Sequence, residues 1–239
     1  GNMSAEPLPW PWRILRRLTY FQADLVTTNN EDSYRILRKF VPYRKLTILP
    51  NPLPDLQHLH VPKDPQSQKS ILYVGRLSYE KGVHILLTAY SDMARQYPAC
   101  PALVIVGDGP SRIDLEILAS KLGLQEKVIW KGEQHNVAKY YSNAHFLVVP
   151  SLREGLPNVV LEALVFELPI IITACSMATK AYVKDGYNGF VVPPANAESL
   201  AQAMTKLYLG KELHGRFSIF SGTLAKRLSA DEVFTKWSA

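Results

Sequence analysis

The sequence has little cysteine and no long apolar run. Two cysteines, Cys100 and Cys175, are present among 239 residues, and their spacing fits neither a zinc site nor a disulfide framework. No apolar stretch approaches the roughly 20 residues that a membrane-spanning helix needs. The first residues lack the form of a signal peptide. These absences lead us to expect a protein of a reducing compartment, the cytoplasm.

Positive charge is in moderate excess. Lys and Arg number 27 against 21 Asp and Glu, a net charge of +6. This charge suits nucleic acid, an anionic membrane face or a phosphorylated small molecule, and composition does not choose among them. The length predicts one domain plus an extension.

The first 50 residues precede a proline-rich segment. We expect helices at Trp10–Phe21 and Asn30–Phe40, and strands at Ala23–Thr28 and Leu46–Leu49. The basic helix Trp10–Phe21 has two interpretations, a membrane-surface helix or an amphipathic helix packed on a core, and we favour the second. Repeated prolines predict a linker at 51–69.

From residue 70 onward, short apolar runs alternate with helical stretches. The expected strands are Ile71–Val74, Ala102–Val106, Val128–Trp130, Phe146–Val149, Ile170–Thr173 and Phe190–Val192. The expected helices are Val83–Gln96, Ser111–Leu122, Asn136–Ser142, Asn158–Phe166, Met177–Val183, Ala197–Tyr208, Glu212–Arg227 and Ala230–Trp237. Apolar strands that are each followed by a helix predict an α/β fold, a Rossmann-like, doubly wound parallel sheet covered on both faces. Such sheets bind ligands beyond the carboxyl ends of their strands.

The loop after the first of these strands runs from Gly75 to Gly82. Arg76 offers a fixed fork of donors and Lys81 a point charge, a suitable pair for two adjacent phosphates. Gly82 opens a helix, whose N-terminus also favours anions. An ordinary turn with solvated charges explains the loop equally well.

The second loop, Gly107-Asp108-Gly109-Pro110, is a weaker signal. A dehydrogenase fingerprint would place a third glycine where Arg112 stands, so the nicotinamide interpretation loses support. We interpret Gly107 and Gly109 as a tight turn near a nucleotide.

The fourth strand leads into the most informative run. Glu154 lies in a loop and Glu162 about one turn into the next helix. The start of that helix, with outward N–H groups, is expected at Gly155, Leu156, Pro157 and Asn158. A diphosphate can bind such a helix start, with hydroxyl groups bound by carboxylates on both flanks. A capping Glu154 with a solvated Glu162 is the alternative.

Together these motifs resemble the family 4 retaining glycosyltransferases, which have the two-domain GT-B fold. The resemblance covers Ser70 to about Leu207. It rests on five motifs in order: the runs at 75–82, 107–110 and 130–132, the Glu154-x7-Glu162 run, and the Asp185-Gly-Tyr-Asn-Gly block. The Glu-x7-Glu run is the most specific of the five.

The resemblance implies a role for each residue. Arg76 and Lys81 would contact the diphosphate of a UDP- or GDP-linked sugar and stabilise the leaving nucleotide, Glu162 would hold the ribose, and Glu154 would contact the donor sugar. Glu154, Arg76 and Lys81 would be catalytic, and Gly75, Gly107 and Gly109 would line the donor site. No metal, other cofactor or nucleic acid is implied, and no Asp-x-Asp run occurs.

The chain departs from the family pattern at three points. Residues 1–50 resemble only the last part of an N-terminal acceptor domain, so residues 70–239 would be the donor-binding domain with its C-terminal helices. Glu167 stands where the family usually has glycine, and Met177, Ala178 and Ala181 replace a glycine-rich loop near the donor sugar.

We therefore expect the donor-binding part of a retaining hexosyltransferase that acts in polysaccharide or glycolipid assembly. Its expected partners are a sugar or lipid-linked acceptor, the missing N-terminal domain or a partner subunit, and peripherally the cytoplasmic face of a membrane. The alternatives are a non-catalytic nucleotide-sugar-binding module or subunit and, with less support, a GT-B epimerase.

Overall fold

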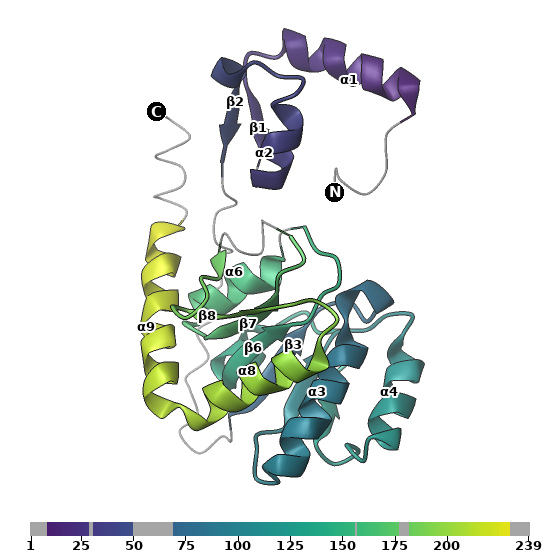
Figure 1. Cartoon of the computed structure of the whole chain (residues 1–239), viewed down its shortest axis with the longest axis vertical. Coiled ribbons are helices and arrows are strands. Elements are labelled where there is room, and N and C mark those ends of the chain that lie inside the picture. Colours follow the sequence, from purple (N-terminus) through teal and green to yellow (C-terminus); the bar gives the residue numbers. More distant parts are fainter. Residues whose placement is uncertain (1–8, 29–30, 50–68, 156, 177–181, 230–239) are drawn as a thin grey trace.

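The computed structural model describes residues 9–28, 31–49, 69–155, 157–176 and 182–229. Most of the expected linker 51–69 and of the expected helix Met177–Val183 lies outside these residues, and so does the whole expected helix Ala230–Trp237. The described residues form a small N-terminal unit and an α/β domain (Figure 1).

The N-terminal unit has two parallel strands and two α-helices. Its elements are α1 (Trp10–Gln22), β1 (Val26–Thr28), α2 (Glu31–Leu37), the short 3-10 helix η1 (Tyr43–Lys45) and β2 (Leu46–Ile48). Its buried core is small and consists of Val26, Leu37, Val41 and Leu46. The helix expected to reach Phe40 ends at Leu37, where the chain turns and the N–H of Val41 bonds to the Leu37 carbonyl.

The interpretation of α1 as a helix packed on a core is confirmed at Tyr20, which packs against the small core, but several other large apolar side chains of the helix are exposed. Trp10 is 72% exposed, and Trp12 and Leu18 are each 59% exposed. Helix periodicity showed that α1 has an apolar side, but it could not show what covers that side.

The α/β domain is built on six parallel strands. Their order across the sheet is β5-β4-β3-β6-β7-β8. The strands are β3 (Ser70–Val74), β4 (Leu103–Val106), β5 (Val128–Trp130), β6 (Ala144–Val149), β7 (Ile170–Thr173) and β8 (Gly189–Val192). The helical elements are η3 (Tyr79–Lys81), α3 (Val83–Gln96), α4 (Arg112–Lys121), α5 (Ala138–Ser142), α6 (Asn158–Val165), α8 (Ala197–Leu209) and α9 (Lys211–Arg227). This confirms the expected fold class.

Helices cover both faces of the sheet, as the apolar strands predict. One face packs against α3, α4 and α8, with Ile71, Ile105 and Phe146 in its core. The other packs against α5 and α6, with Leu72 and Leu147 in its core. Because neighbouring strand residues point to opposite faces, each strand needs apolar side chains throughout.

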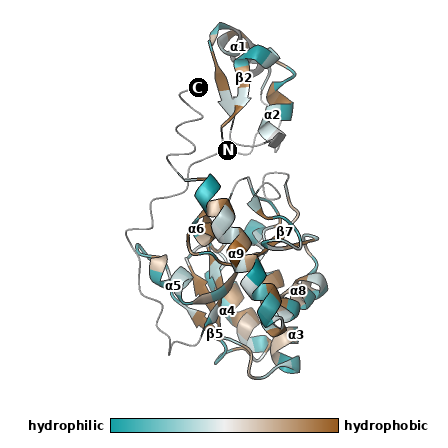
Figure 2. Ribbon diagram, turned by 90° about the vertical axis from the view of Figure 1, so that its left-hand side faces the viewer, coloured by the Kyte–Doolittle hydropathy of each residue, from teal (hydrophilic) through white to brown (hydrophobic). Residues whose placement is uncertain are grey.

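Helix α9 closes the domain beside α6 and α8 (Figure 1). Hydrophobic and hydrophilic segments alternate along it (Figure 2), which is typical of an amphipathic helix. Phe217 is packed into the core on one face of the sheet and Leu228 into the core on the other. The buried hydroxyl of Ser221 donates to the Leu168 carbonyl at 2.8 Å.

Candidate functional site

The strand order places the predicted loops at one point of the sheet. From β3 the chain winds outward through β4 and β5, and from β6 it winds the other way through β7 and β8. The neighbours β3 and β6 therefore flank the switch point, where doubly wound folds bind ligands. Arg76 and Lys81 follow β3, and Glu154 and Glu162 follow β6. The structure thus brings together loops that are about 70 residues apart in the chain.

Backbone contacts hold these two loops against each other. The N–H of Leu152 donates to the Glu80 carbonyl at 2.8 Å. Gly82 has a left-handed φ of 68°, and a Cβ there would lie 2.1 Å from the Pro150 carbonyl oxygen. Glycine at this position therefore lets α3 begin directly against the end of β6.

The loop after β4 supports the first loop. The N–H of Leu77 donates to the Asp108 carbonyl at 2.8 Å, and that of Ser111 donates to the Leu77 carbonyl at 2.9 Å. A Cβ on Gly109 would lie 2.4 Å from the Leu77 carbonyl oxygen, and one on Gly107 would lie 2.0 Å from that of Gly75. The close packing of the loops after β3 and β4 therefore explains why glycine stands at these two positions.

Lys81 and Glu154 form an ion pair. Lys81 Nζ lies 2.5 Å from Glu154 Oε2, and their side chains are 26% and 13% exposed. The carboxylate also accepts from Ser151 Oγ at 3.3 Å and from the Gly155 N–H at 3.2 Å. The expectation that Gly155 would offer a free N–H is therefore wrong for this structure, because the neighbouring carboxylate uses it.

Arg76 is the available cation of the first loop. Its side chain is exposed, and within the described ranges it makes no hydrogen bond or ion pair. Its carbonyl accepts from the hydroxyl of buried Tyr73 at 3.0 Å. Burial raises the pKa of Tyr73 above its ordinary value, and the charges of Glu154 and Glu80 raise it further. The hydroxyl therefore stays protonated and holds the backbone beneath the guanidinium.

Helix α6 points its N-terminus at the site. It begins at Asn158, preceded by Pro157. Its first N–H groups lie directly after the loop that carries Glu154, and no side chain of the described residues caps them. Leu156, which we expected to contribute to the donor site, lies outside the described residues.

Glu162 is held by a residue that the sequence did not single out. The hydroxyl of Tyr141, on α5, donates to Glu162 Oε2 at 2.6 Å. Tyr141 is fully buried. The two residues are 21 positions apart on different helices, so no local pattern connects them.

Glu167 occupies a position that favours glycine. Its φ is 57°, in the left-handed region, which explains why the resembling family usually has glycine there. The Asp185–Pro193 block also has a structural explanation: Asp185 Oδ1 accepts from the Val191 N–H at 2.9 Å, and the buried side chain of Asn188 bridges backbone groups of Tyr182 and Lys184.

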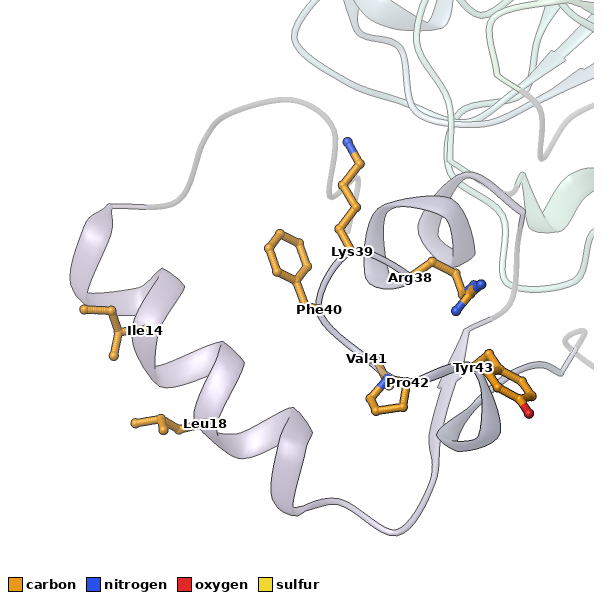
Figure 3. A pocket seen from close by; sticks show the side chains of 8 residues that line it. All are labelled: Ile14, Leu18, Arg38, Lys39, Phe40, Val41, Pro42 and Tyr43. Atoms are coloured by element: carbon orange, nitrogen blue, oxygen red, sulfur yellow. The ribbon is translucent and has the colours of Figure 1, made fainter.

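A separate hollow lies in the N-terminal unit (Figure 3). It has a volume of about 900 Å³, and it is lined by Ile14 and Leu18 from α1 and by residues Arg38 to Tyr43. Its lining carries no carboxylate and is mostly apolar, unlike the edge beside β3 and β6.

Among the described residues, no group of three or more His, Cys, Asp or Glu side chains could hold a metal ion. No helix within the described part of the chain has both the length and the apolar character to cross a membrane.

The chain belongs to the glycosyl transferases group 1 family, which matches residues 58–220. An uncharacterized glycosyltransferase of Haemophilus influenzae is 32% identical over 169 residues, covering 71% of this chain and 48% of that protein. The Campylobacter jejuni GalNAc-alpha-(1->4)-GalNAc-alpha-(1->3)-diNAcBac-PP-undecaprenol alpha-1,4-N-acetyl-D-galactosaminyltransferase is 29% identical, covering 82% of this chain and 54% of that one. The chain thus spans about half the length of these relatives.

The fold agrees with that assignment. The crystal structure of Anabaena HepE in complex with UDP aligns with 95% of this chain and 65% of HepE, at a TM-score of 0.81 and 19% identity. The resemblance to glycosyltransferases is therefore confirmed at the level of family and fold.

Proposed function

We propose that this chain binds a nucleoside diphosphate sugar at the β3–β6 switch point and forms the donor half of a retaining glycosyltransferase. The observation that carries the proposal is the ion pair between Lys81, on the loop after β3, and Glu154, on the loop that leads into α6. Arg76 lies on the first of these loops and Glu162 on α6 itself. Two cations and a helix start suit a diphosphate, and two carboxylates suit the hydroxyls on either side of it.

The proposed roles follow this arrangement. Arg76 and Lys81 bind the diphosphate and stabilise the charge that develops on the leaving nucleotide. Glu162 accepts from the ribose hydroxyls, and Glu154 contacts the donor sugar. Basic side chains take the place of a metal ion in this proposal, and UDP- and GDP-linked sugars are the candidate donors.

The acceptor-binding side of the proposed active site is expected to come from further α/β structure, either the rest of an N-terminal domain or a partner subunit. Two parallel strands are too few for a stable sheet of their own. Trp10 and Trp12, on α1 of the same unit, are exposed. The Campylobacter relative is named for an acceptor linked to undecaprenol, which supports a lipid-linked or sugar acceptor and peripheral contact with a membrane.

Calorimetry with UDP, GDP and ADP tests the donor site. We expect at least one to bind with a Kd in the micromolar to millimolar range, and we expect Lys81→Ala and Glu162→Ala to weaken that binding. Matched controls are Lys121→Ala and Glu126→Ala, which remove the same charges from exposed positions just before β5, at the opposite edge of the sheet. Folded protein that binds none of the three nucleotides would overturn the proposal.

A non-catalytic nucleotide-sugar-binding module is the second candidate, because the Lys81–Glu154 and Tyr141–Glu162 contacts would serve a site that only binds equally well. The chain alone is expected to bind nucleotide without transferring sugar. Adding the proposed α/β acceptor domain or partner subunit separates the candidates: transfer to an acceptor appears if the chain is half of an enzyme, and binding alone persists if it is a module.

A further inference from the structure

Tyr141 stands alongside α6 at the level of Glu162. Its ring stacks on Phe166 with centroids 5.5 Å apart and planes 10° apart, and its hydroxyl meets Glu162 Oε2 at 2.6 Å. Glu162 lies on α6, and Phe166, four positions later, is the C-cap residue of that helix. The phenol therefore contacts both positions, with its ring against Phe166 and its hydroxyl against Glu162.

The hydroxyl remains a donor over the working pH range. Burial raises the pKa of Tyr141 well above its ordinary value, and the charge of Glu162 raises it further. A protonated phenol beside a carboxylate donates a strong, charge-assisted hydrogen bond.

This bond fixes the orientation of the carboxylate. Tyr141 holds Oε2, and within the described residues no group donates to the other oxygen, Oε1. A carboxylate on a flexible side chain otherwise loses rotamer entropy when it binds a ligand. Because Tyr141 already holds Oε2, Oε1 of Glu162 can accept from a ligand with less loss of rotamer entropy.

We infer that Tyr141 is a positioning residue for Glu162, which it orients to accept hydrogen bonds from the ribose of the bound nucleotide. The inference rests on the proposed function, because it gives Glu162 the ribose as its ligand. Tyr141 itself acts through the carboxylate and does not touch the nucleotide.

The test compares the nucleoside diphosphate that binds best among UDP, GDP and ADP with its 2′,3′-dideoxy counterpart. The wild-type chain is expected to prefer the ribose form by about tenfold, because the ribose hydroxyls donate to the charged Glu162 carboxylate and the dideoxy sugar has no such hydroxyls. Tyr141→Phe keeps the ring and its stacking, and it is expected to reduce this ratio to about threefold or less, with affinity for the dideoxy form unchanged. Tyr140→Phe is the matched control, one residue away, and should leave the ratio intact.

An unchanged ratio in Tyr141→Phe would overturn the inference while leaving the donor site standing, and so would an equal loss of affinity for both ligands. Absence of nucleotide binding by the wild type would instead overturn the proposed function.

Glu162→Gln provides a second test should Tyr141→Phe fail to fold. The Tyr141 hydroxyl will bond to the amide oxygen and turn the NH₂ group toward the ribose, where it can only donate to the hydroxyl oxygens and offers no charged acceptor, so the ratio should fall to about threefold or less. A freely rotating amide would present its oxygen instead. A ratio that stays above about threefold would therefore contradict the positioning role.

Discussion

Glu154→Gln isolates the ion pair at the centre of the site. The substitution keeps the shape of the side chain and an oxygen that can accept from the Gly155 N–H, but it removes the charge that holds Lys81 Nζ at 2.5 Å. In the proposed function, a diphosphate has to share or take that ammonium group. Removing its competitor should therefore strengthen the binding of a nucleoside diphosphate that carries no sugar.

The expected magnitude follows from the burial of the pair. Exposed ion pairs contribute at most about 1 kcal/mol, and breaking a buried one costs about 3–5 kcal/mol. With side chains 26% and 13% exposed, the pair lies between these limits. We assign it about 1.5 kcal/mol, which corresponds to about a tenfold gain in affinity when the competition is removed.

Calorimetry at low and high salt measures the effect, which should shrink as salt screens the charges. Glu80→Gln is the matched control, since it makes the same change on the neighbouring loop at a carboxylate that accepts from Ser78. Its gain should be small because Glu80 is exposed. Weaker nucleotide binding by Glu154→Gln would refute the reasoning and would mean that Glu154 contacts the nucleotide directly.

Four further variants test the structural framework. A Cβ at Gly109 would lie 2.4 Å from a carbonyl oxygen of the first loop, so Gly109→Ala should lower the free energy of unfolding in urea by about 1–3 kcal/mol. Glu167 has a left-handed φ of 57°, so Glu167→Gly should raise the free energy of unfolding by about 0.5–1 kcal/mol. Ala195→Gly, at φ 56°, should raise it by a similar amount. Burial lowers the pKa of His145 to about 4, below its ordinary 6.5, so stability should fall as pH drops through this interval. His145→Phe should remove about 1–2 kcal/mol of that fall, after allowance for screening, and an unchanged pH profile of urea unfolding would contradict the assignment.

The α/β domain could be predicted from the sequence because its strands are buried on both faces. Val128–Trp130, Ile170–Thr173 and the helix Val83–Gln96 have the bounds expected from apolar runs and helical periodicity. The strand before α2 was predicted too long, since only Val26–Thr28 pairs. The environment of α1 could not be predicted, because an amphipathic pattern does not identify what the apolar side contacts.

The location of the candidate site could also be predicted, since parallel strands bring their carboxyl ends to one edge. What the sequence did not contain was the pairing of side chains across that edge. Lys81 meets Glu154 over a separation of 73 residues, and Tyr141 meets Glu162 over 21. Both contacts depend on which strands are neighbours and on how the helices between them pack, and neither leaves a local pattern.

A crystal structure of the chain with the nucleoside diphosphate that it binds best would test the central claim most directly. We predict a diphosphate within hydrogen-bonding distance of Arg76 or Lys81 at the N-terminus of α6, and a ribose hydroxyl on Glu162. A nucleotide bound in the hollow between α1 and residues Arg38 to Tyr43, or anywhere else away from the β3–β6 switch point, would contradict it.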